Sequence, residues 1–240
     1  MMWWFTINIL FLGDSLTEGI PGESYLKYLN KKLPNYNLVN FGKGGDTVIS
    51  VYHRIQKQPL TKKYDISFFW IGTNDVYVNV SKLFPLIKNI FHQPWSKNHQ
   101  EFKNYYIKNI EYLKKFSKNI ITVPPLCIGE NLNNKWNKEI KKISKIIKDL
   151  SDKNENITYF NLHKKIFSDF NLEKKSDFIQ KRTLGTLFDG VFLKNKKQID
   201  YRSSDRGLKY TLDGVHLNSY GAQKIADIFY DQIIEIQNSL

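Results

Sequence analysis

Residues 6–19 read TINILFLGDSLTEG, and this stretch decides the fold. Its first half, 6–12, is a nearly continuous apolar run, which is typical of a strand buried on both faces of a parallel sheet. The run leads into Gly13-Asp14-Ser15, and Gly19 follows, so two glycines permit a tight turn that presents the Ser15 hydroxyl at the sheet edge. Taken alone, the tripeptide more simply predicts that Asp14 or Ser15 caps the next helix. A catalytic interpretation of Ser15 therefore needs partners elsewhere in the chain.

Four further apolar runs predict strands in the same way, over 36–41, 65–71, 119–123 and 157–162. Apolar residues at helical spacing predict helices over 25–33, 102–113, 136–150 and 222–233, the last beginning near Asn218 or Ser219 as N-cap. Alternating strands and helices indicate an α/β fold with a parallel sheet covered on both faces. Functional sites in such sheets form at the carboxyl ends of the strands. The residues that follow the first three runs are therefore the first candidates.

Each of those strand ends carries a motif. Gly42-Lys43-Gly44-Gly45-Asp46 follows the second run, and its glycines let backbone N–H groups approach a ligand closely. Gly72-Thr73-Asn74-Asp75 follows the third run and places the side-chain amide of Asn74 at the same edge. Both motifs are weak by themselves, because glycine-rich turns are common and an asparagine here is equally typical of an ordinary turn or cap.

A candidate base lies directly before the last helix, in Asp213-Gly214-Val215-His216. A spacing of three in a turn can bring a carboxylate to the Nδ1–H of the imidazole and leave Nε2 to accept a proton. The other four histidines lack this arrangement and are expected to be surface or structural residues: His53, His92, His99 and His163. Asp189-Gly190-Val191-Phe192 repeats the pattern with phenylalanine in place of histidine, so Asp189 is expected to be a turn residue.

The composition is that of an ordinary globular protein with an excess of lysine. The net charge is +13, but only four of the 36 basic residues are arginines, and the lysines are spread along the whole chain, as on a solvated surface. No nucleic-acid partner is therefore expected, while weak association with anionic surfaces stays open. Cys127 is the single cysteine, and the apolar start of the chain reads as a strand rather than a signal peptide. With no transmembrane stretch either, we expect a cytoplasmic protein.

Residues 1–240 are expected to form a single domain, because a chain of this length can bury one large core. Two segments fit the alternation of strands and helices poorly, namely 76–98 and the lysine-rich 163–210. Long irregular segments near a site are often lids or specificity loops, and a small subdomain is the alternative. We expect a lid or insertion at 163–210. Four aromatic residues of the first segment are expected to line a cleft or to belong to the core: Tyr77, Phe84, Phe91 and Trp95.

The strand-end motifs, in this order from Gly13 to His216, resemble the sequence blocks of the SGNH family, also called GDSL lipases and esterases. The resemblance implies a flavodoxin-like, three-layer α/β/α sandwich around a five-stranded parallel sheet. It also implies a catalytic triad in which Ser15 is the nucleophile, His216 is the general base and Asp213 orients the histidine.

By the same resemblance, the backbone N–H groups of Ser15 and Gly45 and the side-chain amide of Asn74 form an oxyanion hole. The extra glycine in the second motif leaves Gly44 as an alternative to Gly45. No metal or other cofactor is implied.

The expected activity is cleavage of a carboxylic ester through an acyl-enzyme on Ser15. The family includes acyl-esterases, thioesterases, lysophospholipases and carbohydrate O-deacetylases, and the fold does not choose among them. A small-molecule ester is favoured as substrate, and an ester of a glycoconjugate is the main alternative. A catalytically silent binding module that engages an acidic partner is the alternative from another class. The oligomeric state stays open.

Overall fold

The computed structural model describes residues 6–90, 92–167, 176–181, 183–193 and 195–239. Five parallel strands form one sheet in the order β2-β1-β3-β4-β5. Their bounds are Asn8–Gly13 for β1, Asn37–Gly42 for β2, Tyr64–Trp70 for β3, Ser117–Val123 for β4 and Ile157–Tyr159 for β5. The predicted five-stranded parallel sheet is therefore confirmed.

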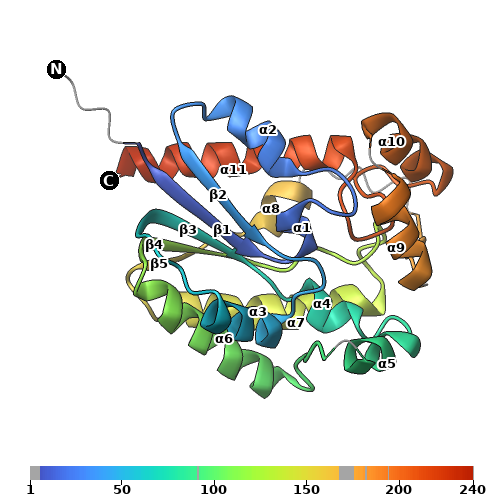
Figure 1. The fold of residues 1–240 in the computed structure, drawn as a ribbon, viewed down its shortest axis with the longest axis horizontal. Coiled ribbons are helices and arrows are strands. Elements are labelled where there is room, and N and C mark those ends of the chain that lie inside the picture. The colour runs from blue at the N-terminus through green and yellow to red at the C-terminus, as the bar shows by residue number, and fades with distance from the viewer. Residues whose placement is uncertain (1–5, 91, 168–175, 182, 194, 240) are drawn as a thin grey trace.

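Helices cover both faces of the sheet and complete three layers (Figure 1). On one face lie α2 (Tyr25–Lys32), α8 (Leu162–Phe167) and α11 (Ser219–Ser239), and on the other lie α3 (Val48–Lys57), α6 (His99–Lys114) and α7 (Lys135–Ser151). Two short helices, α1 (Ser15–Glu18) and α4 (Thr73–Tyr77), directly follow β1 and β3. The remaining helices are α5 (Leu83–Ile90), α9 (Thr183–Phe192) and α10 (Lys196–Asp205).

The two outer strands correct the prediction that every strand is buried on both faces. β2 is half-buried to exposed along its length, because it lies at one edge of the sheet. β5 lies at the other edge and ends at Tyr159, three residues before the end of the predicted run. The apolar residues that follow Tyr159 are also buried, but they are not part of the strand, because Leu162 already begins α8.

Aromatic packing fixes the face covered by α2 and α11. Phe11 of β1 stacks on Phe68 of β3 with the ring centroids 5.1 Å apart, and Tyr25 and Phe229 contact the same cluster. All four side chains are fully buried or nearly so. Burying one such ring contributes roughly 1.5 to 3 kcal/mol. This core holds β1 in register, and β1 carries the candidate serine at its end.

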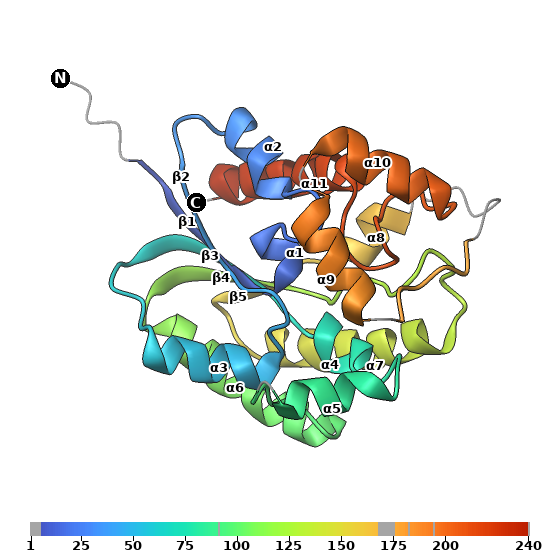
Figure 2. The same cartoon turned by 45° about the vertical axis from the view of Figure 1, so that its right-hand side comes forward.

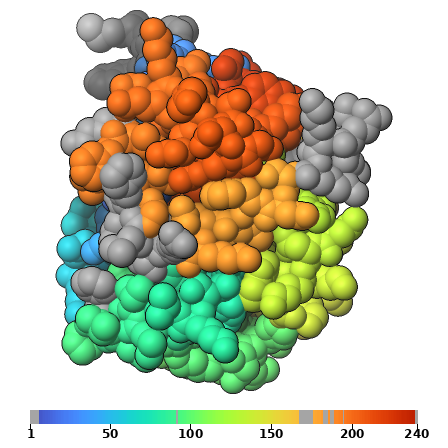
Figure 3. Space-filling model, turned by 90° about the vertical axis from the view of Figure 1, so that its right-hand side faces the viewer, coloured from blue at the N-terminus to red at the C-terminus, as the bar shows by residue number. Residues whose placement is uncertain are grey.

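The register of the central strands brings the predicted motifs to one edge. Gly13 at the end of β1 pairs with Gly42 of β2 on one side and with Trp70 of β3 on the other. The chain segments that follow these three residues therefore leave the sheet side by side. Figure 2 shows α5 and α9 at this same end of the molecule, and Figure 3 shows the end face with α5 along its lower edge and α10 above.

Candidate active site

The sharp turn after β1 presents Ser15 as the first residue of α1. Asp14 is the N-cap of α1, and its Oδ1 accepts a hydrogen bond of 3.0 Å from the Leu16 N–H. The turn depends on Gly13, where an added Cβ would lie 2.6 Å from the carbonyl oxygen of Trp70. The helix-cap and catalytic interpretations of the tripeptide are thus compatible, because Asp14 caps the helix while Ser15 is free to face a partner.

The structure joins Ser15, His216 and Asp213 in one chain of hydrogen bonds. Ser15 Oγ lies 2.9 Å from His216 Nε2, and His216 Nδ1 lies 2.7 Å from Asp213 Oδ2. The other carboxylate oxygen, Oδ1, accepts the backbone N–H groups of Val215 and His216 at 3.0 and 2.8 Å. All members of this chain are buried. With Nδ1–H donating to Asp213, Nε2 is the acceptor for the serine hydroxyl.

Burial and charge set the protonation of this chain of residues. Burial alone would lower the pKa of His216, but the charge and hydrogen bond of Asp213 raise it above its ordinary value. Burial alone would raise the pKa of Asp213, but His216 and the two backbone N–H groups bring it below its ordinary value. Asp14 differs, since burial raises its pKa to about 7 despite the Leu16 hydrogen bond. Asp213 is therefore the permanent anion beside the imidazole.

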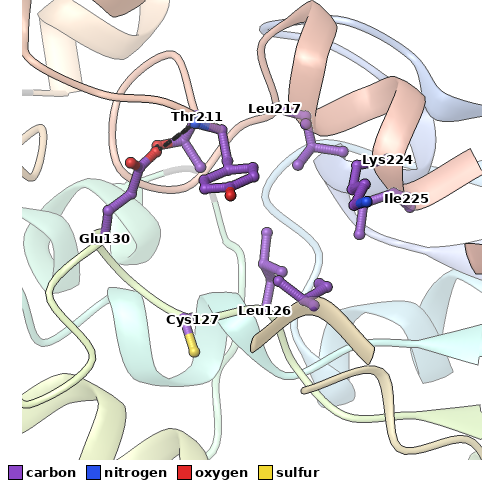
Figure 4. A pocket seen from close by; sticks show the side chains of 11 residues that line it. Leu126, Cys127, Glu130, Thr211, Leu217, Lys224 and Ile225 are labelled. Carbon is purple, nitrogen blue, oxygen red and sulfur yellow. Dashed lines mark hydrogen bonds between the residues drawn. The ribbon is translucent and has the colours of Figure 1, made fainter. Parts of the chain in front are cut away.

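A buried glutamate that the sequence analysis missed holds the segment before Asp213. The Glu130 carboxylate accepts the backbone N–H groups of residues 209, 210 and 211 at 2.8, 2.8 and 2.9 Å, and the Thr211 hydroxyl at 2.9 Å. Figure 4 shows Glu130 extending to Thr211 beside an apolar hollow lined by Leu126, Leu217 and Ile225. That hollow has a volume of only ≈ 30 Å³, far below that of a ligand pocket. Nothing in the sequence marks Glu130, because its partners lie 79 to 81 positions away.

The turn after β2 is fixed by bonds to three other segments. Gly44 N–H donates to Glu18 Oε2 at 2.6 Å, and Gly45 adopts a left-handed φ of 76°. The Asp46 carbonyl accepts a hydrogen bond of 3.0 Å from the Asn74 side-chain amide. The Asp46 carboxylate forms a buried ion pair with Arg54 Nε at 2.7 Å. These bonds fix the turn that carries Gly44 and Gly45 relative to Asn74.

Arg54 is a second residue that sequence reasoning missed. Its Nη2 donates to the carbonyl of Phe41 at 3.0 Å and to that of Gly13 at 3.4 Å. One guanidinium thus ties the ends of β1 and β2 to Asp46. The signal in the sequence is its place on a helix that follows a glycine-rich turn, and that place does not reveal its partners.

These residues form the floor of a cleft of ≈ 540 Å³, a volume typical of ligand pockets. Ser15, Gly45, Asn74 and His216 lie together in it, and its walls are mainly apolar. The walls come from the two segments that did not fit the alternation of strands and helices. Segment 76–98 contributes Val78, Phe84 and Ile87, and segment 163–210 contributes Gly190 and Val191.

Of the aromatic residues predicted for this region, Tyr77 and Phe84 line the cleft while also belonging to the core. Trp95 belongs to the core as well and lines a neighbouring hollow rather than the cleft, and Phe91 lies outside the described residues. Of the 163–210 segment, residues 168–175, 182 and 194 also lie outside them.

Asp189 is not the turn residue that the repeated motif predicted. It lies in α9, is 1% exposed, and forms a bidentate ion pair with Arg206 at 2.7 and 3.3 Å. Arg206 also donates to the carbonyl of Leu212 at 3.0 Å. The prediction failed because the motif resembles a turn locally, whereas a partner 17 residues away stabilises the carboxylate inside a helix.

The remaining histidines stand apart from the cleft floor. His163 Nε2 lies 2.7 Å from the carbonyl of Pro125, and His99 Nε2 lies 3.0 Å from a carboxylate oxygen of Glu139. His53 and His92 are exposed. Among the described residues, no three His, Cys, Asp or Glu side chains gather as a metal site would require. Within those same ranges, no helix is both long and apolar enough to cross a bilayer.

Fold and site together define an α/β serine hydrolase. The chain belongs to the GDSL-like Lipase/Acylhydrolase family, whose sequence profile matches residues 9–229. It is accordingly an ester-hydrolysing enzyme of the SGNH fold, as the motifs predicted. A comparison with curated proteins finds no match.

Several solved structures share the fold. The acetyl xylan esterase AlAXEase is 22% identical, with a TM-score of 0.64 over 95% of this chain and 100% of that one. Axe2, an acetylxylan esterase from Geobacillus stearothermophilus, is 20% identical, with a TM-score of 0.63 over 97% and 96%. A lipolytic G-D-S-L family protein from Veillonella parvula is 14% identical, with a TM-score of 0.62 over 94% and 97%. At these identities the likeness establishes the fold alone.

Proposed function

We propose that this protein hydrolyses a small carboxylic ester through an acyl-enzyme on Ser15. The observation that carries the proposal is the buried chain from Ser15 Oγ through His216 to Asp213, which opens onto a cleft. His216 removes the hydroxyl proton through Nε2 as Ser15 attacks the carbonyl carbon. It then gives the proton to the leaving alcohol, and water attacks the acyl-enzyme by the same route. Asp213 keeps the imidazole in the required tautomer and stabilises its charged form.

Three N–H donors are proposed to hold the oxyanion of the tetrahedral intermediate: the backbone N–H groups of Ser15 and Gly45 and the second N–H of the Asn74 amide. The hydrogen bonding of the two N–H groups supports Gly45 over Gly44. The N–H of Gly44 already donates to Glu18, whereas that of Gly45 has no acceptor among the described residues. Asn74 is oriented by its bond to the Asp46 carbonyl, which leaves its other N–H for the cleft.

The apolar walls favour an acyl group over a free sugar ring at this depth of the cleft, since few polar groups are available there to satisfy hydroxyls. We also propose that 163–210 is an insertion whose helix α9 forms one wall, through Gly190 and Val191. The segment would then restrict which esters reach Ser15.

Carbohydrate O-deacetylation is a second candidate. It is supported by two of the structural neighbours, which are described as acetylxylan esterases and match nearly the full length of this chain. In that case only the acetyl group enters the apolar cleft, and the sugar remains at its mouth.

The test is hydrolysis of p-nitrophenyl esters from acetyl to dodecanoyl by wild type and by folded Ser15→Ala protein, alongside release of acetate from acetylated xylo-oligosaccharides. We expect activity that Ser15→Ala loses, with a preference for the shorter chains. Acetate release from the saccharide at a comparable kcat/KM would favour the second candidate. A wild-type protein that cleaves none of these and whose Ser15 resists a fluorophosphonate would refute both and favour a binding module.

A further inference from the structure

Lys88 is a half-buried ammonium that the proposed chemistry has not used. It lies on α5, and its Nζ donates to the carbonyl oxygen of Gly45 at 2.8 Å and lies 3.3 Å from Gln93 Oε1. Among the described residues that line the catalytic cleft, it is the one lysine or arginine. A lysine is normally solvated, so its place in a cleft with mainly apolar walls calls for a reason.

The contact with Lys88 satisfies the Gly45 carbonyl, which has no other hydrogen-bond partner among the described residues. The neighbouring groups of the turn have other partners: Gly44 N–H bonds to Glu18, Asp46 N–H bonds to the Lys43 carbonyl, and the Asp46 carbonyl bonds to Asn74. The Gly45 carbonyl has only Lys88 among the described residues. Gly45 is in the left-handed region, and Gln93 fills the space where a side chain would stand, with Oε1 3.2 Å from the ideal Cβ position.

We propose that Lys88 is a positioning residue of the oxyanion hole, which anchors Gly45 through its carbonyl oxygen and adds positive charge where negative charge develops. The inference rests on the proposed function. Covalent geometry places Nζ at most about 6 to 7 Å from the Gly45 nitrogen, because the carbonyl oxygen it contacts belongs to the same residue. A fixed charge at that range in a partly desolvated cleft favours the transition state over the neutral ester.

Three carboxylates lie near Lys88, and two of them already have other hydrogen-bond or ion-pair partners. Carboxylates face it from three segments, Asp75 of α4, Asp46 after β2 and Asp14 after β1. Burial lowers the pKa of Lys88, and these carboxylates partly restore it, so the pKa lies below its ordinary value. Asp46 is paired with Arg54, and Asp75 is bonded to the N–H groups of Val48 and Ser96.

The test compares Lys88→Met and Lys88→Arg with Lys82→Met, an exposed lysine just before the same helix, as the control. With p-nitrophenyl butyrate we expect Lys88→Met to lower kcat by about tenfold or more with KM changed less than twofold. Lys88→Arg should restore most of kcat, and Lys82→Met should match wild type. The wild-type kcat should also fall at alkaline pH as Lys88 loses its proton, and this limb should be missing in Lys88→Met.

The rate of fluorophosphonate labelling of Ser15 provides a readout that needs no ester substrate. A slower rate in folded Lys88→Met, rescued by Lys88→Arg, supports the proposal. Labelling and kcat within twofold of wild type in Lys88→Met would overturn it and leave the proposed function intact. An arginine variant as impaired as the methionine variant would overturn the role of the charge. Failure of the wild-type protein to label would instead refute the proposed function itself, and the role of Lys88 with it.

Discussion

Replacing Asn74 with alanine removes one of the three proposed oxyanion donors and leaves the chain of Ser15, His216 and Asp213 intact. One amide N–H bonds to the Asp46 carbonyl at 3.0 Å, and the other is available to the cleft. Loss of a single donor of this kind costs about 10²- to 10³-fold in kcat, or roughly 2.7 to 4 kcal/mol. KM should change little, because the donor acts on charge that exists only in the transition state.

The same change also removes the bond that orients the Asp46 carbonyl. That bond is worth about 0.5 to 1.5 kcal/mol in stability, which corresponds to a fall of roughly 1 to 6 °C in Tm for a chain of this size. Steady-state kinetics on p-nitrophenyl butyrate and thermal unfolding measure the two effects separately. Asn79→Ala is the matched control, since Asn79 is an exposed asparagine just beyond the same helix. Folded Asn74→Ala protein with kcat within threefold of wild type would refute the role of Asn74.

Three further predictions follow from buried charges. Asp14→Asn keeps the oxygen that caps α1 but removes a charge that raises the pKa of His216. The acid limb of the pH profile of kcat/KM should therefore move to lower pH. An unmoved limb would show that Asp14 is neutral in the pH range of that limb. Glu130→Ala leaves two buried N–H groups and one part-buried N–H group without an acceptor, so it should lower stability by roughly 3 kcal/mol and kcat with it. Glu130→Gln should do less harm, and equal stability of all three proteins would contradict this. Asp189→Asn leaves the Arg206 guanidinium without its ion-pair partner and should cost about 3 to 5 kcal/mol in unfolding free energy. The double change Asp189→Leu with Arg206→Met should cost less, and a double variant that unfolds at lower urea concentration than Asp189→Asn would contradict this.

The pH dependence of activity follows from the pKa of His216. The base must be neutral, and its pKa lies above the ordinary value, so activity should fall as pH drops through a value above about 6.5. For stability the sign is opposite. The contribution of the charged His216 to folding is present below about pH 6.5 and is lost as pH rises through the raised pKa.

Local sequence patterns were sufficient to predict the central strands of the sheet and the turns that follow them. The apolar runs of β1, β3 and β4 are buried on both faces, so their sequences show the pattern that a parallel sheet requires, and the turn residues that follow them reveal the site. At the two edges of the sheet the same pattern predicted full burial for β2, which is half-exposed, and too long a strand for β5, which has only three residues.

The residues that support the site escaped prediction for a different reason. Glu130, Arg54, Asp189 and Lys88 each act through a partner that is remote in sequence or is a backbone group, and such contacts exist only once the fold is formed. A single sequence records the residue type but not the partner. The motifs around Ser15 and His216 were recognisable because the chemistry proposed for them demands fixed local spacing.

The bond between Ser15 Oγ and His216 Nε2 joins residues 201 positions apart, near the two ends of the chain. Loop-closure entropy makes a contact of such long range slow to form, because it must bring the segment before α11 to the end of β1. Under the proposed mechanism, a chain in which this contact has not yet formed carries an unactivated serine. During refolding, the return of a Ser15 that reacts with a fluorophosphonate would then report when the C-terminal segment reaches the end of β1.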